Sequence, residues 1–163
     1  MGLSFNADEI FEIAEQIERN GAKFYRKAAK FIADAKAKNL FEQLAKMEDR
    51  HLKIFHGMRE QLSQEQKAPT VWDPDGEAAL YLEAMADGRV FDVSKDPCDM
   101  LTGKESAIDV LRMAIGIEKD SVVFYMGMKP LVPAELGTGK VEDIIKEEMR
   151  HIGVLNREMR KIV

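Results

Sequence analysis

Apolar residues recur along much of this chain at alternating spacings of four and three, a pattern that predicts long helices with one buried stripe each. One such seam runs from Ala7 to Ile32 and a second from Ala37 to Leu62. Two more occur near Ala107 to Met128 and near Val141 to Ile162. The spacing is the one that suits packing of helices along their length. We therefore expect an all-α protein built as a four-helix bundle.

The first pair of helices is repeated by the second pair at an offset of 100 residues. Residues 18–25 read ERNGAKFY and residues 118–125 read EKDSVVFY, while residues 48–51 and 148–151 read EDRH and EMRH. Each half is therefore expected to be one helical hairpin, and the two halves to descend from an old duplication.

The expected single domain divides into hairpin one at 6–66, a crossover at 67–103 and hairpin two at 104–163. Asn6 and Ser106 each stand three residues before an acid, as N-caps do, and mark the start of the first helix in each hairpin. Proline and glycine punctuate the crossover, which also holds a stretch, GEAALYLEAMADGRVF, that predicts a short helix. A connection of this length joins two hairpins running end to end across a bundle.

Polar residues interrupt the buried stripes at corresponding places. Glu48 and His51 share a row with Phe41 and Leu44, and the second hairpin repeats this arrangement. A glutamate lies 30 residues upstream of each Glu-x-x-His pair, which brings it level with that pair across an antiparallel hairpin. Six side chains are thus expected to converge at one level of the bundle: Glu18, Glu48, His51, Glu118, Glu148 and His151.

Four carboxylates buried together would repel one another and lose hydration, so their pKa values would rise until some took up protons. Two divalent cations would balance the four negative charges, with the imidazoles as neutral ligands. This donor set suits two iron ions, with manganese or zinc as alternatives. A lone Glu-x-x-His occurs often on solvated helix faces, but two copies in register favour a metal site.

Four neighbours of the six could assist them. Tyr25 and Tyr125 lie two turns from Glu18 and Glu118 on the same face. There they would hydrogen-bond the ligand carboxylates, pass electrons to the metals or simply fill the core. Between each Glu and His stands an arginine, either behind the ligands or on a solvated face: Arg50 and Arg150. His56 lies off the ligand row, and we expect it to be a surface or satisfied histidine.

Composition and charge narrow the function classes. The net charge is −5 with a sequence pI of about 5.3, and no basic face is evident, so no nucleic-acid partner is expected. No segment reaches membrane-spanning length and the N-terminus lacks a secretory pattern, so we expect a cytoplasmic protein. The single cysteine, Cys98, excludes an internal disulfide and any Cys-x-x-Cys site.

With these residues in view, the sequence resembles the rubrerythrin branch of the ferritin-like di-iron carboxylate superfamily, on the doubled E…ExxH pattern across four helices. The resemblance implies that Glu48 and Glu148 bridge two metals. It further implies that Glu18 with His51 completes the ligand set of one metal and that Glu118 with His151 completes that of the other. Rubrerythrins typically append a rubredoxin-like domain with paired Cys-x-x-Cys motifs, which this sequence lacks, so electrons would come from a separate donor protein such as a rubredoxin.

Two departures from related patterns bear on function. Ser121 stands where rubrerythrins tend to carry a further glutamate, which weakens a direct transfer of their peroxidase activity. The short fifth helix usual in ferritins is not seen either, which makes a mineral-storing cage a weaker expectation. We expect a non-haem di-iron oxidoreductase that reduces hydrogen peroxide or dioxygen. A ferroxidase or iron-handling protein, and a non-enzymatic metal-binding bundle, remain alternatives.

The crossover also suggests an interaction surface. Its apolar residues would either dock a second subunit, giving the homodimer we expect, or pack over the bundle: Trp72, Leu80, Tyr81 and Leu82.

Overall fold

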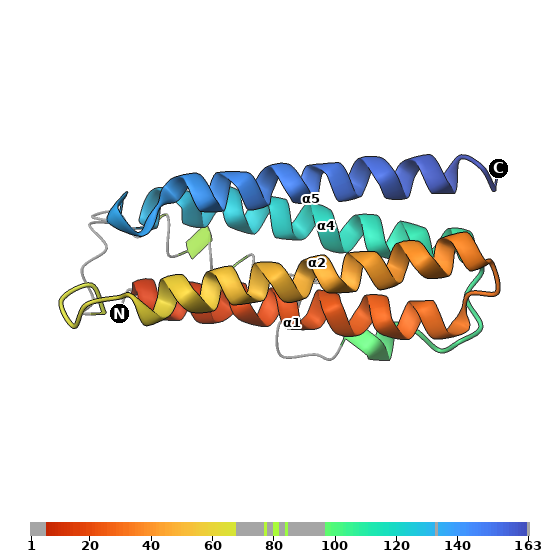
Figure 1. Ribbon diagram of the computed structural model, residues 1–163, viewed down its shortest axis with the longest axis horizontal. Coiled ribbons are helices and arrows are strands. Elements are labelled where there is room, and N and C mark those ends of the chain that lie inside the picture. Colours follow the sequence, from red (N-terminus) through yellow and green to blue (C-terminus); the bar gives the residue numbers. More distant parts are fainter. Residues whose placement is uncertain are drawn as a thin grey trace.

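Two helical hairpins lie side by side in the computed structural model, which describes residues 6–67, 77, 80, 81, 84, 97–132 and 134–162 (Figure 1). In each hairpin the two helices are antiparallel, and the four long helices together form one bundle. The predicted all-α bundle of two joined hairpins is confirmed, since every regular element in the described part of the chain is helical. The long helices are α1 (Ala7–Phe31), α2 (Ala35–Glu60), α4 (Ala107–Met128) and α5 (Thr138–Met159).

The helix starts follow from local capping. Asn6 and Glu9 form a reciprocal capping box at the start of α1, and the Ser106 side chain accepts from the Asp109 amide at the start of α4. Both predicted N-caps are confirmed. The second helix begins at Ala35, two residues earlier than predicted, because the side chain of Asp34 accepts from the Ala37 amide and caps it.

The fourth helix begins at Thr138, three residues before the predicted start at Val141. It follows Gly137, which has a φ of 90°. This left-handed conformation suits glycine, and it lets the chain enter the helix directly from the preceding 3₁₀ turn, Ala134–Leu136. The apolar pattern could not mark this start, because Thr138, Gly139 and Lys140 add nothing to the buried stripe.

The predicted stripes form the core, with one exception. Phe31 continues the four-and-three spacing of the first predicted helix, which predicts its burial, but it is 50% exposed, so that prediction is wrong. It is the final residue of α1, where the bundle no longer surrounds the helix, and its ring lies against Gly103 instead. The fully enclosed residues of largest volume are aromatic and lie along the bundle axis: Phe11, Phe24, Tyr25, Phe41, Phe55, Phe124 and Tyr125.

The crossover connects opposite ends of the bundle, since α2 ends beside the start of α1 and α4 begins at the far end (Figure 1). Glu77, Leu80, Tyr81 and Ala84 are helical, in agreement with the predicted short helix. The remainder of that stretch lies outside the described residues, as do Trp72 and Leu82. A 3₁₀ turn at Pro97–Met100 precedes the second hairpin.

Tyr81 fastens the described part of the crossover to the second hairpin. Its hydroxyl donates to the Val123 carbonyl over 2.8 Å. Its ring packs so closely on Gly127 that a Cβ there would lie 2.1 Å from the ring. The side chain of Leu80 is 62% exposed.

Among the described residues, no helix has the length and apolar character needed to cross a bilayer.

Candidate metal centre

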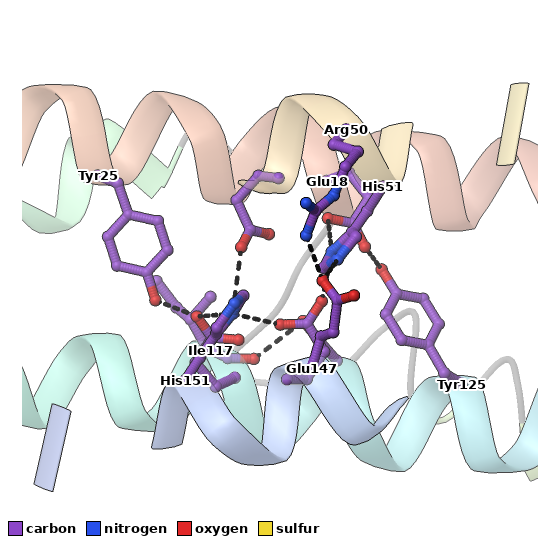
Figure 2. Close-up of polar contacts among 12 residues, drawn as sticks. Glu18, Tyr25, Arg50, His51, Ile117, Tyr125, Glu147 and His151 are labelled. Carbon is purple, nitrogen blue, oxygen red and sulfur yellow. Dashed lines mark hydrogen bonds and ion pairs between the residues drawn. The ribbon is translucent and has the colours of Figure 1, made fainter. Parts of the chain in front are cut away.

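Six acidic and imidazole side chains meet in the interior of the bundle, halfway along its helices. The second helix of each hairpin contributes the Glu-x-x-His pair of its buried stripe, the first helix contributes the glutamate 30 residues upstream, and none of the six is more than 3% exposed. They come from both hairpins, so neither hairpin alone completes the cluster (Figure 2). The cluster consists of Glu18 on α1, Glu48 and His51 on α2, Glu118 on α4, and Glu148 and His151 on α5.

The six divide into two overlapping sets of four that could each hold a metal ion. Within each set, one ligand atom per residue lies within 4.8 Å of all the others. The first set takes Glu18 and His51, and the second takes Glu118 and His151. Glu48 and Glu148 belong to both sets, which is the position of a bridging ligand. The structure thus brings together all six side chains that the sequence nominated.

Both imidazoles turn the same ring nitrogen toward the carboxylates. Nδ1 of His51 lies 2.7 Å from Oε1 of Glu148 and 3.5 Å from Oε2 of Glu18. Nδ1 of His151 lies 2.8 Å from the other oxygen of Glu148 and 3.4 Å from Glu118. The two rings are nearly parallel, with centroids 6.0 Å apart. Glu148 therefore sits between two imidazoles, one oxygen toward each.

Although they lie close together, several of these buried atoms form no hydrogen bond of suitable geometry with any described residue. They include Nδ1 of both histidines and both oxygens of Glu148, together with Oε2 of Glu18 and Oε1 of Glu48. Buried polar atoms are rarely left unpaired, because each costs about 1–3 kcal/mol of lost hydration. Here the orphaned atoms are lone-pair donors that face one another. The chemistry and placement of this set fit a pair of divalent cations.

Protonation in the metal-free protein reflects the same crowding. Burial, reinforced by the negative charge of Glu148, raises the pKa of Glu118 to about 8. Burial likewise raises the pKa of Glu18 and of Glu48. Glu148 is the exception: burial acts to raise its pKa, but contact with both histidines outweighs burial and lowers it. Without metal, protons must replace the missing positive charge.

The two histidines hold protons correspondingly tightly. Burial alone would lower the pKa of an imidazole, but the surrounding carboxylates outweigh it. The pKa of His51 rises to about 11 beside Glu148 and Glu18. That of His151 rises to about 9 beside Glu118 and Glu148. A cation bound at Nδ1 would have to displace these protons.

Two buried tyrosines flank the cluster, one on each side (Figure 2). Tyr25 of α1 donates its hydroxyl hydrogen bond to Glu118 on α4, and Tyr125 of α4 donates to Glu18 on α1. Each tyrosine therefore binds the glutamate of the opposite hairpin rather than that of its own helix. Burial, followed by the neighbouring carboxylate charge, raises the pKa of both phenols, so they remain hydrogen-bond donors. Of the roles expected for these tyrosines, the structure shows hydrogen bonding to carboxylates of the cluster.

A glutamate that sequence reasoning missed, Glu147, lies on the outer side of His51. Its Oε2 is 3.0 Å from Nε2 of His51 and 2.5 Å from a guanidinium nitrogen of Arg50. Arg50 therefore reaches the cluster through Glu147, whereas Arg150 is exposed and pairs with no site residue within the described ranges. Sequence offered no direct signal for Glu147, because it adjoins Glu148 in a run of two identical residues. The predicted surface histidine, His56, is 56% exposed and contacts Glu15 at 3.2 Å.

A groove between α2 and α5 lies on the outer side of the cluster, and Glu147 is one of the residues that line it. It encloses about 590 Å³ and is lined by both charged and apolar side chains from the two helices. Arg50, Lys53 and Lys140 contribute positive charge to it, and Asp143 and Glu147 negative charge. The His51 edge of the cluster therefore lies behind a solvent-facing groove rather than beneath a continuous apolar layer.

Comparison with known proteins agrees with this geometry. The rubrerythrin family model matches residues 3–69, which hold the first hairpin and its three cluster residues. A crystal structure from Thermotoga maritima, titled as that of a ferritin-like diiron-carboxylate protein, has a TM-score of 0.76 and 24% identity to this chain, with 98% of both chains covered. That likeness confirms the ferritin-like fold, and the family match confirms the resemblance to rubrerythrins. No curated protein is significantly similar in sequence.

Proposed function

We propose that this rubrerythrin-like chain is a non-haem di-iron oxidoreductase that reduces hydrogen peroxide or dioxygen. The observation that carries the proposal is the pair of overlapping four-residue sets sharing Glu48 and Glu148. Four carboxylates and two neutral imidazoles match the charge of two divalent cations and the ligand preference of iron. Manganese and zinc would accept the same ligands, so the metal is part of the proposal.

Each residue of the cluster has a distinct role in this proposal. Glu48 and Glu148, which belong to both sets, would be shared by the two cations. Glu18 and His51 would complete the ligand set of one cation, and the corresponding pair from the second hairpin would complete that of the other. Tyr125 holds one oxygen of Glu18 by hydrogen bonding, which leaves the second oxygen free to face the metal. Tyr25 donates the corresponding hydrogen bond to one oxygen of Glu118.

When bound, two ferrous ions would supply the two electrons that, with two protons, convert hydrogen peroxide to two molecules of water. The chain's own contribution is to hold the ligands in place before the oxidant arrives and to keep bulk water away. Aromatic rings enclose both ends of the cluster, since Phe55 packs against Tyr125 and Phe41 stacks on Tyr25. A separate donor protein, of the rubredoxin type, would restore the electrons after each turnover.

Metal loading and turnover test the proposal together. Protein purified without oxygen should contain two irons per chain and should consume peroxide steadily when a reduced rubredoxin supplies electrons. Replacing a cluster histidine, His51→Ala, should abolish turnover and weaken iron binding by at least tenfold. His56→Ala is the matched control, because His56 lies on the same helix but outside the cluster, and it should change neither.

Other outcomes would assign a different function. Oxygen uptake in proportion to added ferrous iron would identify a ferroxidase, provided that no peroxide is consumed when the donor protein supplies electrons. Stoichiometric zinc in protein isolated from cells, with no response to peroxide, would indicate a structural or metal-buffering bundle. Failure to bind two metals of any kind would overturn the metal centre itself.

A further inference from the structure

The two halves of the cluster differ on the outer side of their histidines. His51 turns Nδ1 toward the carboxylates, and its other nitrogen, Nε2, lies 3.0 Å from Glu147 of α5. Glu147 is 25% exposed and is itself held by Arg50, so a guanidinium, a carboxylate and an imidazole form a row leading inward from the surface (Figure 2).

The second hairpin has no equivalent row. Subtracting 100 from 147 leads to Met47, a thioether that is at most a weak acceptor. Nε2 of His151 accordingly has no hydrogen-bond partner in the described part of the chain. The six cluster residues are repeated faithfully between the hairpins, but this contact is not. The duplication has therefore produced two metal positions with identical ligands and different surroundings.

A carboxylate at the outer nitrogen of a metal-binding histidine has a defined effect. A neutral imidazole carries one N–H, and an acceptor at Nε2 keeps the proton there, which leaves the Nδ1 lone pair free for the metal. The same contact holds the ring in position and makes the nitrogen a stronger base toward the cation. Without such an acceptor, the ring orientation depends on packing alone.

We propose that Glu147 is a positioning residue that makes the metal position completed by Glu18 and His51 the tighter of the two. The inference rests on the proposed metal centre and assigns a hierarchy within it. The His51 side fills first and retains its ion longer, while the ion on the His151 side is the more readily exchanged. Arg50 supports this role by holding the carboxylate of Glu147 against the ring.

Zinc titration of the metal-free full-length chain against a coloured chelator measures the hierarchy. The unmodified chain should bind two ions in steps of unequal affinity. Glu147→Met, which copies the residue found in the other hairpin, should weaken the tighter step by about tenfold to a hundredfold and leave the other nearly unchanged. Glu147→Gln keeps an oxygen acceptor without its charge. Its zinc affinity at the tighter step should lie between those of the unmodified chain and Glu147→Met. The reciprocal Met47→Glu should strengthen the weaker step.

NMR of the zinc-loaded chain labelled with ¹⁵N-histidine separates positioning from a general loss of structure. His51 should show a slowly exchanging Nε2–H proton, shifted downfield by its carboxylate acceptor, and His151 should not. Glu147→Met should remove that signal while leaving the helical content intact. Glu142→Met is the control on the same helix, because Glu142 pairs with Lys129 and Lys146 away from the cluster. It should leave affinities and signal unchanged.

The outcomes distinguish this inference from the function on which it rests. If the unmodified chain binds two zinc ions and Glu147→Met leaves both affinities within twofold, the positioning role is overturned and the metal centre stands. An unchanged Nε2–H signal in that variant would count against the inference equally. If the unmodified chain fails to bind two ions, both are overturned.

Discussion

Gly21 is the residue whose substitution tests the packing of the cluster most directly. It lies in α1 opposite Glu48, and a Cβ added there would lie 2.8 Å from Oε2 of that glutamate and 3.3 Å from its carboxyl carbon. Ordinary contact between such atoms needs about 3.5 Å, so the nearer carboxylate oxygen would have to move by roughly 0.7 Å. Metal sites tolerate ligand displacements of only about 0.2 Å. Gly21→Ala should therefore displace Glu48, the proposed bridging ligand, without changing its chemistry.

Two opposing effects set the size of the change. Replacing glycine by alanine inside a helix stabilises it by up to about 1 kcal/mol, which for a domain of this size raises Tm by about 2–4 °C. Gly153→Ala should show this full gain, because nothing lies within 4 Å of the Cβ position at that exposed site in α5. At Gly21 the gain is offset by displacement of Glu48, and metal affinity should fall about tenfold, equivalent to about 1.4 kcal/mol.

Thermal unfolding of both variants, with and without bound zinc, measures the balance. We expect Gly153→Ala to raise Tm equally in both states. Gly21→Ala should raise it, if at all, only without metal, where the protonated Glu48 is free to turn aside. If Gly21→Ala stabilised the metal-loaded protein as much as Gly153→Ala did and left zinc affinity unchanged, the close approach of Glu48 to α1 would be refuted.

Two further expectations concern the polar interior. Tyr125→Phe removes the hydrogen-bond donor to Glu18 and should destabilise the metal-free protein by about 1–3 kcal/mol in urea unfolding. Tyr81→Phe, at a partly exposed site, should cost under about 1 kcal/mol. Equal losses in the two variants would contradict the difference expected between a buried and an exposed hydrogen bond. The metal-free protein should also lose stability as pH rises from about 6.5 to 9. The folded state retains protons on His51 and His151, with pKa values of about 11 and about 9, whereas the unfolded chain releases them near 6.5. Up to about pH 8 it also retains a proton on Glu118, which the unfolded chain releases near 4.5. The lowered pKa of Glu148 contributes stability that is already complete above about pH 4.5, so it does not reverse the loss of stability at higher pH. A Tm that rises towards pH 9 in the presence of a chelator would refute the retention of protons by the folded cluster.

The sequence predicted the core stripes well because the same helical periodicity holds along every helix of a bundle. A helix is regular, so spacings of three and four determine which residues share a face wherever the helix is placed. The predicted stripe of the second helix, from Phe41 to Leu62, is buried throughout. The failures lie at helix ends, as at Phe31 and before Val141. There, burial and helix initiation depend on where neighbouring helices stop and on single caps.

The meeting of the six cluster residues was also predictable, and the reason is geometric. The glutamate 30 residues upstream of each Glu-x-x-His comes level with it because the turn of each antiparallel hairpin lies midway between them, between α1 and α2 or between α4 and α5. The repeat at an offset of 100 then requires the second hairpin to copy the first, so the doubled pattern specifies one level of a bundle. Only the docking of the two hairpins had to be supplied by the fold.

Contacts between the hairpins were decided by tertiary structure alone. Tyr25 and Glu118 are 93 residues apart, and Tyr125 and Glu18 are 107 apart, so nothing in local spacing pairs each tyrosine with the opposite half. The contact of Glu147 with His51 spans 96 residues and has no copy in the repeat. Helical periodicity specifies a side chain's direction from its own axis, and so the sequence by itself determined which residues face inward. Which of them touch depends on the rotation and height of one hairpin against the other, which the packing of the whole core sets.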